Sequence, residues 1–120
     1  MKNIIIPVSF CYPHFSNSAS ERFRCDWLLK YLPADKYDGS QNLDNYDVII
    51  YQKAHSPQMV EYTRKNNHKI QIFDTTDPEW FFKENIQIKE IVKNISFITV
   101  STADVADGFR EHYNIKTHVI

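Results

Sequence analysis

Polar side chains gather directly after several short apolar segments of this 120-residue sequence. They supply an amine, an imidazole, carboxylates and hydroxyl groups. Groups of these types can hold a polar or anionic ligand, and an amine beside a carboxylate can also act in acid-base chemistry. The residues are Lys53, His55, Asp74, Thr76, Asp77, Ser101 and Thr102.

Some of these residues also have a purely structural interpretation. Ser56, Asp77 and Ser101 each stand where a helix N-cap is expected, and a cap stabilises a helix by about 1 kcal/mol without any ligand. Lys53 closes an apolar segment, where an amine is costly to bury unless it forms an ion pair or reaches a cleft. An ion pair with Asp74 or Asp77 and a role in a binding site therefore both remain open for Lys53.

Two further pairs of residues are candidates for binding an anion or lining a cleft. Arg22 and Arg24 lie at the start of a predicted helix, whose N-terminal dipole favours anions, so either could hold a phosphate or a carboxylate. The alternative is a solvated basic face beside Trp27. His14 and His55 fall on predicted loops at the same edge, and ordinary surface positions are the alternative for both.

The pattern does not support a metal or cofactor site. Asp74 and Asp77 follow a strand, as in proteins that bind a hard cation there, but Ser9-Phe10 stands where further acidic residues are needed. No pair among the five histidines has the helical spacing of zinc ligands. No nucleophile with an adjacent base can be assembled, so the catalytic residues stay unassigned, and Lys53 with one of the aspartates is the remaining small-enzyme alternative.

Composition excludes several classes of function. The 14 basic and 15 acidic residues give a net charge of −1, which offers no basic surface for nucleic acid. Gly39 and Gly108 are the only glycines, so the sequence contains no phosphate-binding glycine loop. Cys11 and Cys25 lack metal-ligand or disulfide-motif spacing, and the longest apolar run, residues 4–8, is too short to cross a bilayer. We expect a reduced, cytoplasmic protein without a transmembrane segment.

Strands and helices must position these polar groups, and the sequence predicts that the two kinds of element alternate along the chain. Helices are predicted between most strands: one ends at Pro33, another begins at Ser56-Pro57, a third contains Ile86 to Ile95, and Ser101 or Thr102 caps the last. Such alternation predicts a three-layer α/β Rossmann-like domain over residues 1–120, with a mostly parallel sheet and helices on both faces. Strands are expected at residues 4–8, 47–53, 69–74, 97–100 and 116–120, with a short edge strand near Tyr37.

Parallel strands bring their carboxyl ends to one edge of a sheet, and ligands of open α/β sheets bind there. The polar groups that follow the strands should therefore share one rim. This placement turns residues that are far apart in the sequence into one candidate site.

Several segments together resemble the N-terminal half of bacterial GT-B-type glycosyltransferases of the group 1, family 4-like kind. The resemblance covers nearly the whole chain and about half of the family's enzyme. Within the family this half binds the acceptor, while a C-terminal domain binds the nucleotide sugar through a motif with two glutamates. The segments are Arg24 to Leu32, Tyr46 to Lys53, Phe73 to Trp80, Thr99 to Thr102 and His118 to Ile120.

The resemblance implies roles for individual residues. Lys53, Asp74, Asp77, Ser101 and Thr102 match cleft positions and are implied to contact the acceptor or the second domain. Many retaining members carry a histidine in this cleft, but the loop after the third strand has none. His55, which follows the second strand, is the nearest candidate, and its role stays unassigned.

The resemblance predicts the acceptor-side domain of a glycosyltransferase, inactive without a donor-binding domain. Its expected partners are a saccharide or glycolipid acceptor and a donor-binding domain or second protein chain. The alternative is a non-catalytic Rossmann-like module that acts through protein contacts. Self-association through the edge strand that ends at Ile120 would suit this alternative, because an unprotected edge invites pairing.

Overall fold

The computed structural model describes residues 4–6, 28–53, 57–76 and 86–120. Six strands form one sheet in the order β2-β1-β3-β4-β5-β6, and every neighbouring pair is parallel. This confirms the predicted α/β, Rossmann-like fold class. The strands are β1 (Ile4–Ile6), β2 (Ala34–Lys36), β3 (Val48–Gln52), β4 (Ile70–Thr75), β5 (Phe97–Val100) and β6 (Thr117–Val119).

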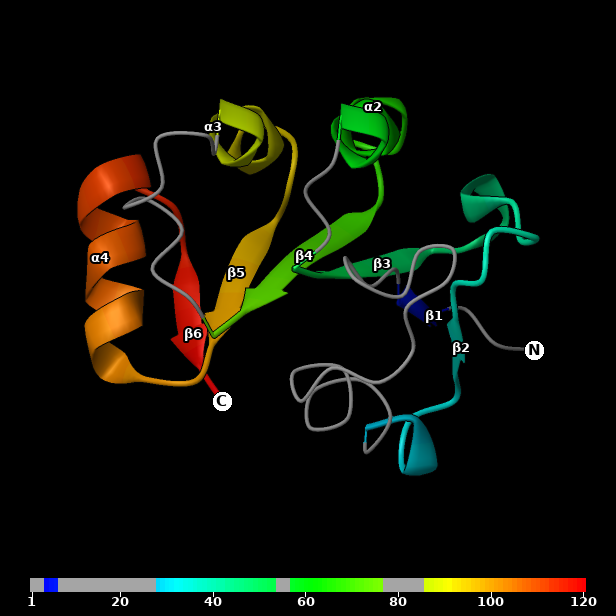
Figure 1. Cartoon of the computed structure of the whole chain (residues 1–120), viewed down its shortest axis with the longest axis horizontal. Helices are drawn as coiled ribbons and strands as arrows, with labels where there is room; N and C mark the ends of the chain where they lie inside the picture. Colours follow the sequence, from blue (N-terminus) through cyan, green and yellow to red (C-terminus); the bar gives the residue numbers. More distant parts are fainter. Residues whose placement is uncertain (1–3, 7–27, 54–56, 77–85) are drawn as a thin grey trace.

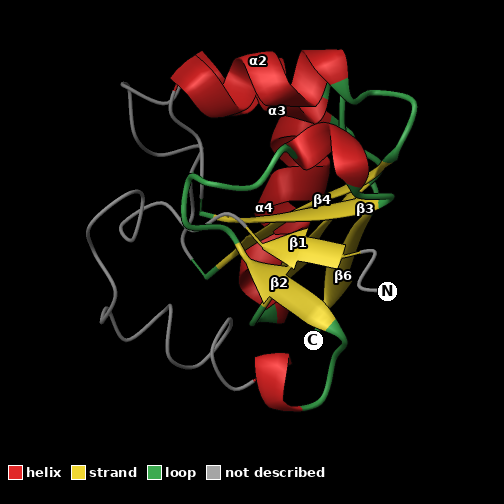
Figure 2. Ribbon diagram, turned by 90° about the vertical axis from the view of Figure 1, so that its right-hand side faces the viewer, coloured by secondary structure: helices red, strands yellow, loops and turns green. Residues whose placement is uncertain are grey.

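The helices of the described residues divide between the two faces of the sheet. Helices α2 (Pro57–Lys65), α3 (Ile86–Val92) and α4 (Ala103–Tyr113) share one core with the sheet, and Figure 1 shows α2 and α3 side by side over β3 to β5. The short 3₁₀ helix η2 (Leu28–Lys30) lies on the other side, as Figure 2 shows. A second 3₁₀ helix, η3 (Leu43–Asn45), precedes β3.

The main core lies between the sheet and the three α-helices. Tyr51, Phe73 and Ile98 are fully buried neighbours on β3, β4 and β5, in register with one another. Successive strand residues point to opposite faces, so these side chains share the helix-covered face. On the other face, Ile6 and Ala34 form a smaller cluster that includes partly buried residues such as Ile50.

A buried glutamine ties three elements of the core together. The hydroxyl of Tyr51 donates a hydrogen bond to Oε1 of Gln71 at 2.5 Å. The Gln71 amide nitrogen donates to the carbonyls of Thr63 in α2 and Asn94 after α3, each at 3.0 Å. Burial raises the pKa of Tyr51, so its hydroxyl keeps the proton that this network uses.

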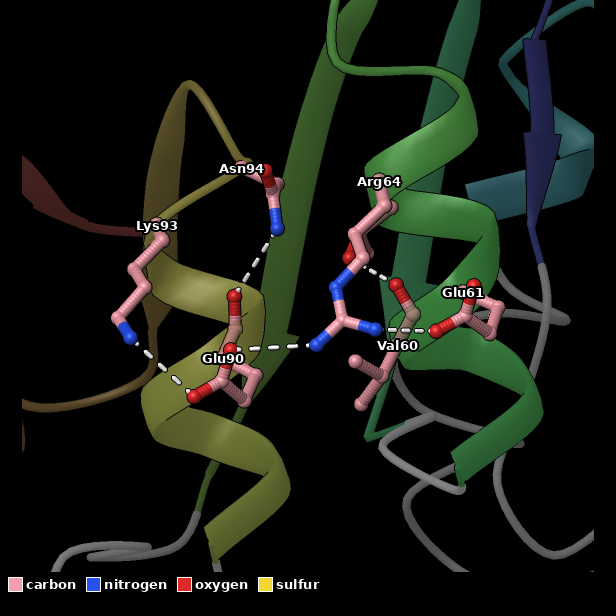
Figure 3. A network of polar contacts seen from close by, with 7 residues as sticks. Val60, Glu61, Arg64, Glu90, Lys93 and Asn94 are labelled. Atoms are coloured by element: carbon pink, nitrogen blue, oxygen red, sulfur yellow. Dashed lines mark hydrogen bonds and ion pairs between the residues drawn. The ribbon is translucent and has the colours of Figure 1, made fainter.

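An exposed ion-pair network links α2 to α3 (Figure 3). Arg64 contacts Glu61 on its own helix and Glu90 on α3, the latter at 3.3 Å between Nη2 and Oε2. Lys93 also reaches Glu90, at 3.2 Å, and the amide of Asn94 donates to the Glu90 carbonyl at 3.1 Å. Hydrogen bonds from Lys93 and Arg64 lower the pKa of Glu90. Ion pairs this exposed contribute little stability, so the contact between α2 and α3 rests mainly on their buried side chains.

Element boundaries agree closely with the sequence patterns. The strand expected at residues 97–100 is β5 itself, and the edge strand expected near Tyr37 is β2, which ends one residue earlier. Pro57 is the first residue of α2, as the Ser-Pro pattern predicts. The helix start expected at Pro78 and most of the helix expected before Pro33 lie outside the described residues. No helix in the described ranges is long and apolar enough to cross a membrane.

The structure decides between the two candidate caps of α4. The Thr102 hydroxyl accepts a hydrogen bond from the backbone N–H of Val105 at 3.3 Å, and Thr102 has extended backbone dihedrals. Ser101 precedes the cap and is exposed. The capping interpretation of Ser101 is therefore wrong, and Thr102 has that role.

Removing the cap gives a stability prediction with an adjacent control. Thr102→Ala should lower the free energy of unfolding by about 1 kcal/mol, because one N–H of the first turn of α4 loses its partner. Ser101→Ala should change it far less. Urea denaturation followed by circular dichroism measures both, and equal losses in the two variants would contradict the assignment.

Candidate functional site

The carboxyl edge of the sheet collects the predicted site residues that the structure describes. Lys53 follows β3, Asp74 lies near the end of β4, and Ser101 follows β5. These three strands are adjacent and parallel, so the three residues share one edge. The backbone N–H of Lys53 donates to the carbonyl of Asp74 at 2.9 Å, which joins the ends of β3 and β4 directly.

Lys53 has an unusual backbone conformation. Its φ of 53° lies in the left-handed region, where a residue other than glycine pays a steric penalty. The hydrogen bond to Asp74 holds this conformation, which turns the chain out of the strand direction at the sheet edge. Backbone strain of this kind concentrates at binding and catalytic sites, which makes Lys53 a stronger candidate than its position in the sequence indicates.

A row of polar side chains crosses the sheet just inside this edge. Gln52, Asp74, Thr99 and His118 occupy matching register positions on β3, β4, β5 and β6. Residues paired in this way point to the same face, here the face opposite the α-helices. Burial decreases along the row, from 1% exposed at Gln52 through 4% at Asp74 and 9% at Thr99 to an exposed His118. The row therefore opens toward solvent at β6.

The buried part of the row is hydrogen-bonded. The hydroxyl of Thr99 donates to Oδ1 of Asp74 at 2.6 Å. Asp74 thus lies within the sheet layer, beneath the rim, and its carboxyl group is oriented by its neighbour on β5. Lys53 and Ser101, in contrast, follow β3 and β5 and lie at the rim itself.

An aromatic side chain borders the open end of the row. The rings of Phe97 and His118 meet edge to face, with centroids 5.2 Å apart. This contact fixes the orientation of the exposed imidazole. The exposed end of the row thus combines an aromatic ring with an imidazole.

Sequence reasoning missed three members of this row: Gln52, Thr99 and His118. Gln52 and Thr99 lie in the otherwise apolar strands β3 and β5, whereas His118 lies in the mixed strand Thr117–Val119. The available signal was a polar residue interrupting an otherwise apolar face. Only the register between strands shows that these interruptions align.

The remaining predicted residues divide into two groups. Thr76 is half-buried just beyond β4, and Thr102 is exposed at the start of α4, so both belong to the same edge. Arg24, His55 and Asp77 lie outside the described residues, and their assignment to the site stays a prediction. The same holds for Arg22, His14 and Ser56.

A hollow lies at the opposite, amino-terminal edge of the sheet. It has a volume of about 300 Å³ and is lined by Asp44, Lys65, Asn66, His68 and Lys69. The ammonium of Lys69 is already bound to the carbonyls of Leu43 and Asp44, at 3.1 and 2.7 Å. This lysine fixes η3 against the start of β4, so the hollow is less suited to a ligand than the carboxyl edge.

The carboxyl edge can therefore bind a polar ligand through an amine, hydroxyl groups and an imidazole, over a buried carboxyl group that orients its surroundings. The hydroxyl of Thr99 and the carboxyl group of Asp74 are hydrogen-bonded to each other, but both are buried below the rim, and we assign neither as a nucleophile or a base. In the comparisons with known proteins, no family model, no curated protein and no solved structure matches this chain.

Proposed function

We propose that this chain is the acceptor-side domain of a glycosyltransferase, which binds the acceptor while sugar is transferred from a nucleotide sugar. The observation that carries the proposal is the gathering of Lys53, Thr76 and Ser101 at the ends of adjacent parallel strands, above the buried carboxyl group of Asp74. A saccharide presents many hydroxyl groups that both donate and accept hydrogen bonds. An amine and side-chain hydroxyls at one rim match that pattern.

The proposed division of labour follows from what this edge contains. Lys53 donates hydrogen bonds to acceptor oxygens, and the hydroxyls of Thr76 and Ser101 donate or accept as the sugar requires. The sequence has no glycine-rich loop for a diphosphate, so the nucleotide sugar binds to a donor-binding domain. Transfer then takes place where that domain meets the carboxyl edge.

Acceptor binding by this chain tests the proposal. Saturation-transfer NMR with a panel of oligosaccharides and glycolipid headgroups should detect binding, and Lys53→Ala should weaken it roughly tenfold, as expected for one lost charge-assisted hydrogen bond. Lys65→Ala is the matched control, because it removes an exposed lysine at the other edge of the sheet. It should leave saccharide binding unchanged.

Two results would contradict the proposal. One is the absence of binding across the whole saccharide panel. The other is equal binding by the wild type and the Lys53→Ala variant, which would show that ligands bind elsewhere. Sugar transfer by this chain alone would contradict the dependence on a separate donor-binding domain.

A further inference from the structure

The outer edge of β6 exposes only part of its backbone. Lys116 and Ile120 pair with β5, because the Lys116 carbonyl accepts from Ile98 and the Ile120 N–H donates to Val100, each at 2.9 Å. Backbone groups alternate sides along a strand, so those of Thr117 and Val119 point away from the sheet. These outward groups are the ones through which another strand could pair.

A side chain from α4 forms a hydrogen bond with one of these outward backbone groups. The guanidinium Nη2 of Arg110 donates to the carbonyl of Thr117 at 2.7 Å. Its other terminal nitrogen binds Asp107 one turn earlier, at 3.1 Å, which holds the guanidinium in place. Helix α4 runs alongside β6 (Figure 1), so Arg110 reaches the strand edge from within the same fold.

The opposite edge strand, β2, has a comparable contact. The N–H of Tyr37 donates to Ile6 on β1, so the backbone groups of Lys36 point outward. The amide nitrogen of Gln41 donates to the Lys36 carbonyl at 3.0 Å, and the Gln41 amide oxygen accepts from the N–H of Asp38, also at 3.0 Å. Two unrelated side chains thus occupy outward carbonyls on the two edges of one sheet.

We propose that Arg110 and Gln41 are edge guards, which keep the sheet from pairing with the sheet of a second copy of this chain. A strand that approached β6 would have to displace the guanidinium from Thr117 and leave it without that acceptor. While the guanidinium stays on the Thr117 carbonyl, the strand offers only the Thr117 N–H and the backbone groups of Val119, which is too short a stretch for a stable ladder. Charged side chains and covered carbonyls at sheet edges are known means of preventing such pairing.

Arg110→Met tests the guard on β6. Methionine keeps an apolar stem against α4 and removes the donor, so the Thr117 carbonyl becomes free. Sedimentation velocity should show self-association of this variant at concentrations about tenfold or more below any at which the wild type associates. Amide hydrogen exchange at Val119 should slow as concentration rises in this variant only. Gln41→Leu tests β2 in the same way, and the double variant should associate most strongly.

Control variants distinguish the effect of the Arg110–Thr117 hydrogen bond from the effects of a lost positive charge and of lower stability. Arg64→Ala removes an arginine on α2 away from both edges and should not change self-association. Arg110→Lys retains a cationic donor and should restore most of the wild-type behaviour. Equal self-association of Arg110→Met, Arg64→Ala and the wild type would overturn the proposal. Slower amide hydrogen exchange at Val119 with rising concentration of the wild type would also overturn it. That measurement does not depend on the folding of any variant.

Discussion

Phe73→Ala should lower the free energy of unfolding by about 3 to 5 kcal/mol, a large part of the 5 to 15 kcal/mol typical of a domain. The side chain is fully buried on β4, between its register partners Tyr51 on β3 and Ile98 on β5. Truncation to alanine removes apolar contacts and leaves a cavity that the parallel strands cannot close by moving together.

Ile70→Ala provides the control on the same strand. Ile70 begins β4 and is 52% exposed, so its truncation removes less buried apolar surface and leaves no closed cavity. We expect a loss below about 1 kcal/mol. Chemical denaturation gives both values when the two curves are fitted with the same dependence of the free energy of unfolding on denaturant concentration. Similar losses for the two variants would mean that β4 is not at the centre of the core.

Gln71→Leu should lower the free energy of unfolding by about 2 to 4 kcal/mol, although it places an apolar side chain in a buried position. Gln71 is fully buried, and its amide serves the hydroxyl of Tyr51 and the carbonyls of Thr63 and Asn94. Leucine has a similar volume but satisfies none of these groups. The buried hydroxyl of Tyr51 then loses its acceptor, and the two carbonyls lose a donor.

A double-mutant cycle isolates the Tyr51–Gln71 hydrogen bond. Tyr51→Phe alone leaves the Gln71 amide oxygen without its donor, whereas in the double variant both ends of the bond are apolar. The double variant should therefore lose less stability than the sum of the single variants. Strict additivity would show that the two side chains do not depend on each other.

The central strands could be predicted because each is a short, dense apolar segment with polar residues at its boundary. Val48 to Gln52 and Phe97 to Val100 are examples in which the expected and observed bounds differ by one residue at most. In a parallel sheet both faces are covered, so the strands lack the alternation that would identify an exposed face. The pattern consequently located strands well but could not assign side chains to faces.

The candidate site was predicted in outline from the same patterns. The placement of Lys53, Asp74 and Ser101 at one edge follows from parallel strands alone, and the structure has them there. The left-handed conformation of Lys53 and the burial of Asp74 under Thr99 were not predictable. Both depend on contacts between strands that lie about twenty or more residues apart.

Local properties of the sequence therefore determined the order of elements, the fold class and the polar ends of the strands, because hydrophobic period, caps and proline act within a few residues. Tertiary structure alone decided the register that aligns Gln52 with His118 and the contact of Arg110 with the edge of β6. Register depends on how strands and helices pack against one another across the sheet. A shift of one residue would move every side chain of a strand to the other face without changing the local pattern.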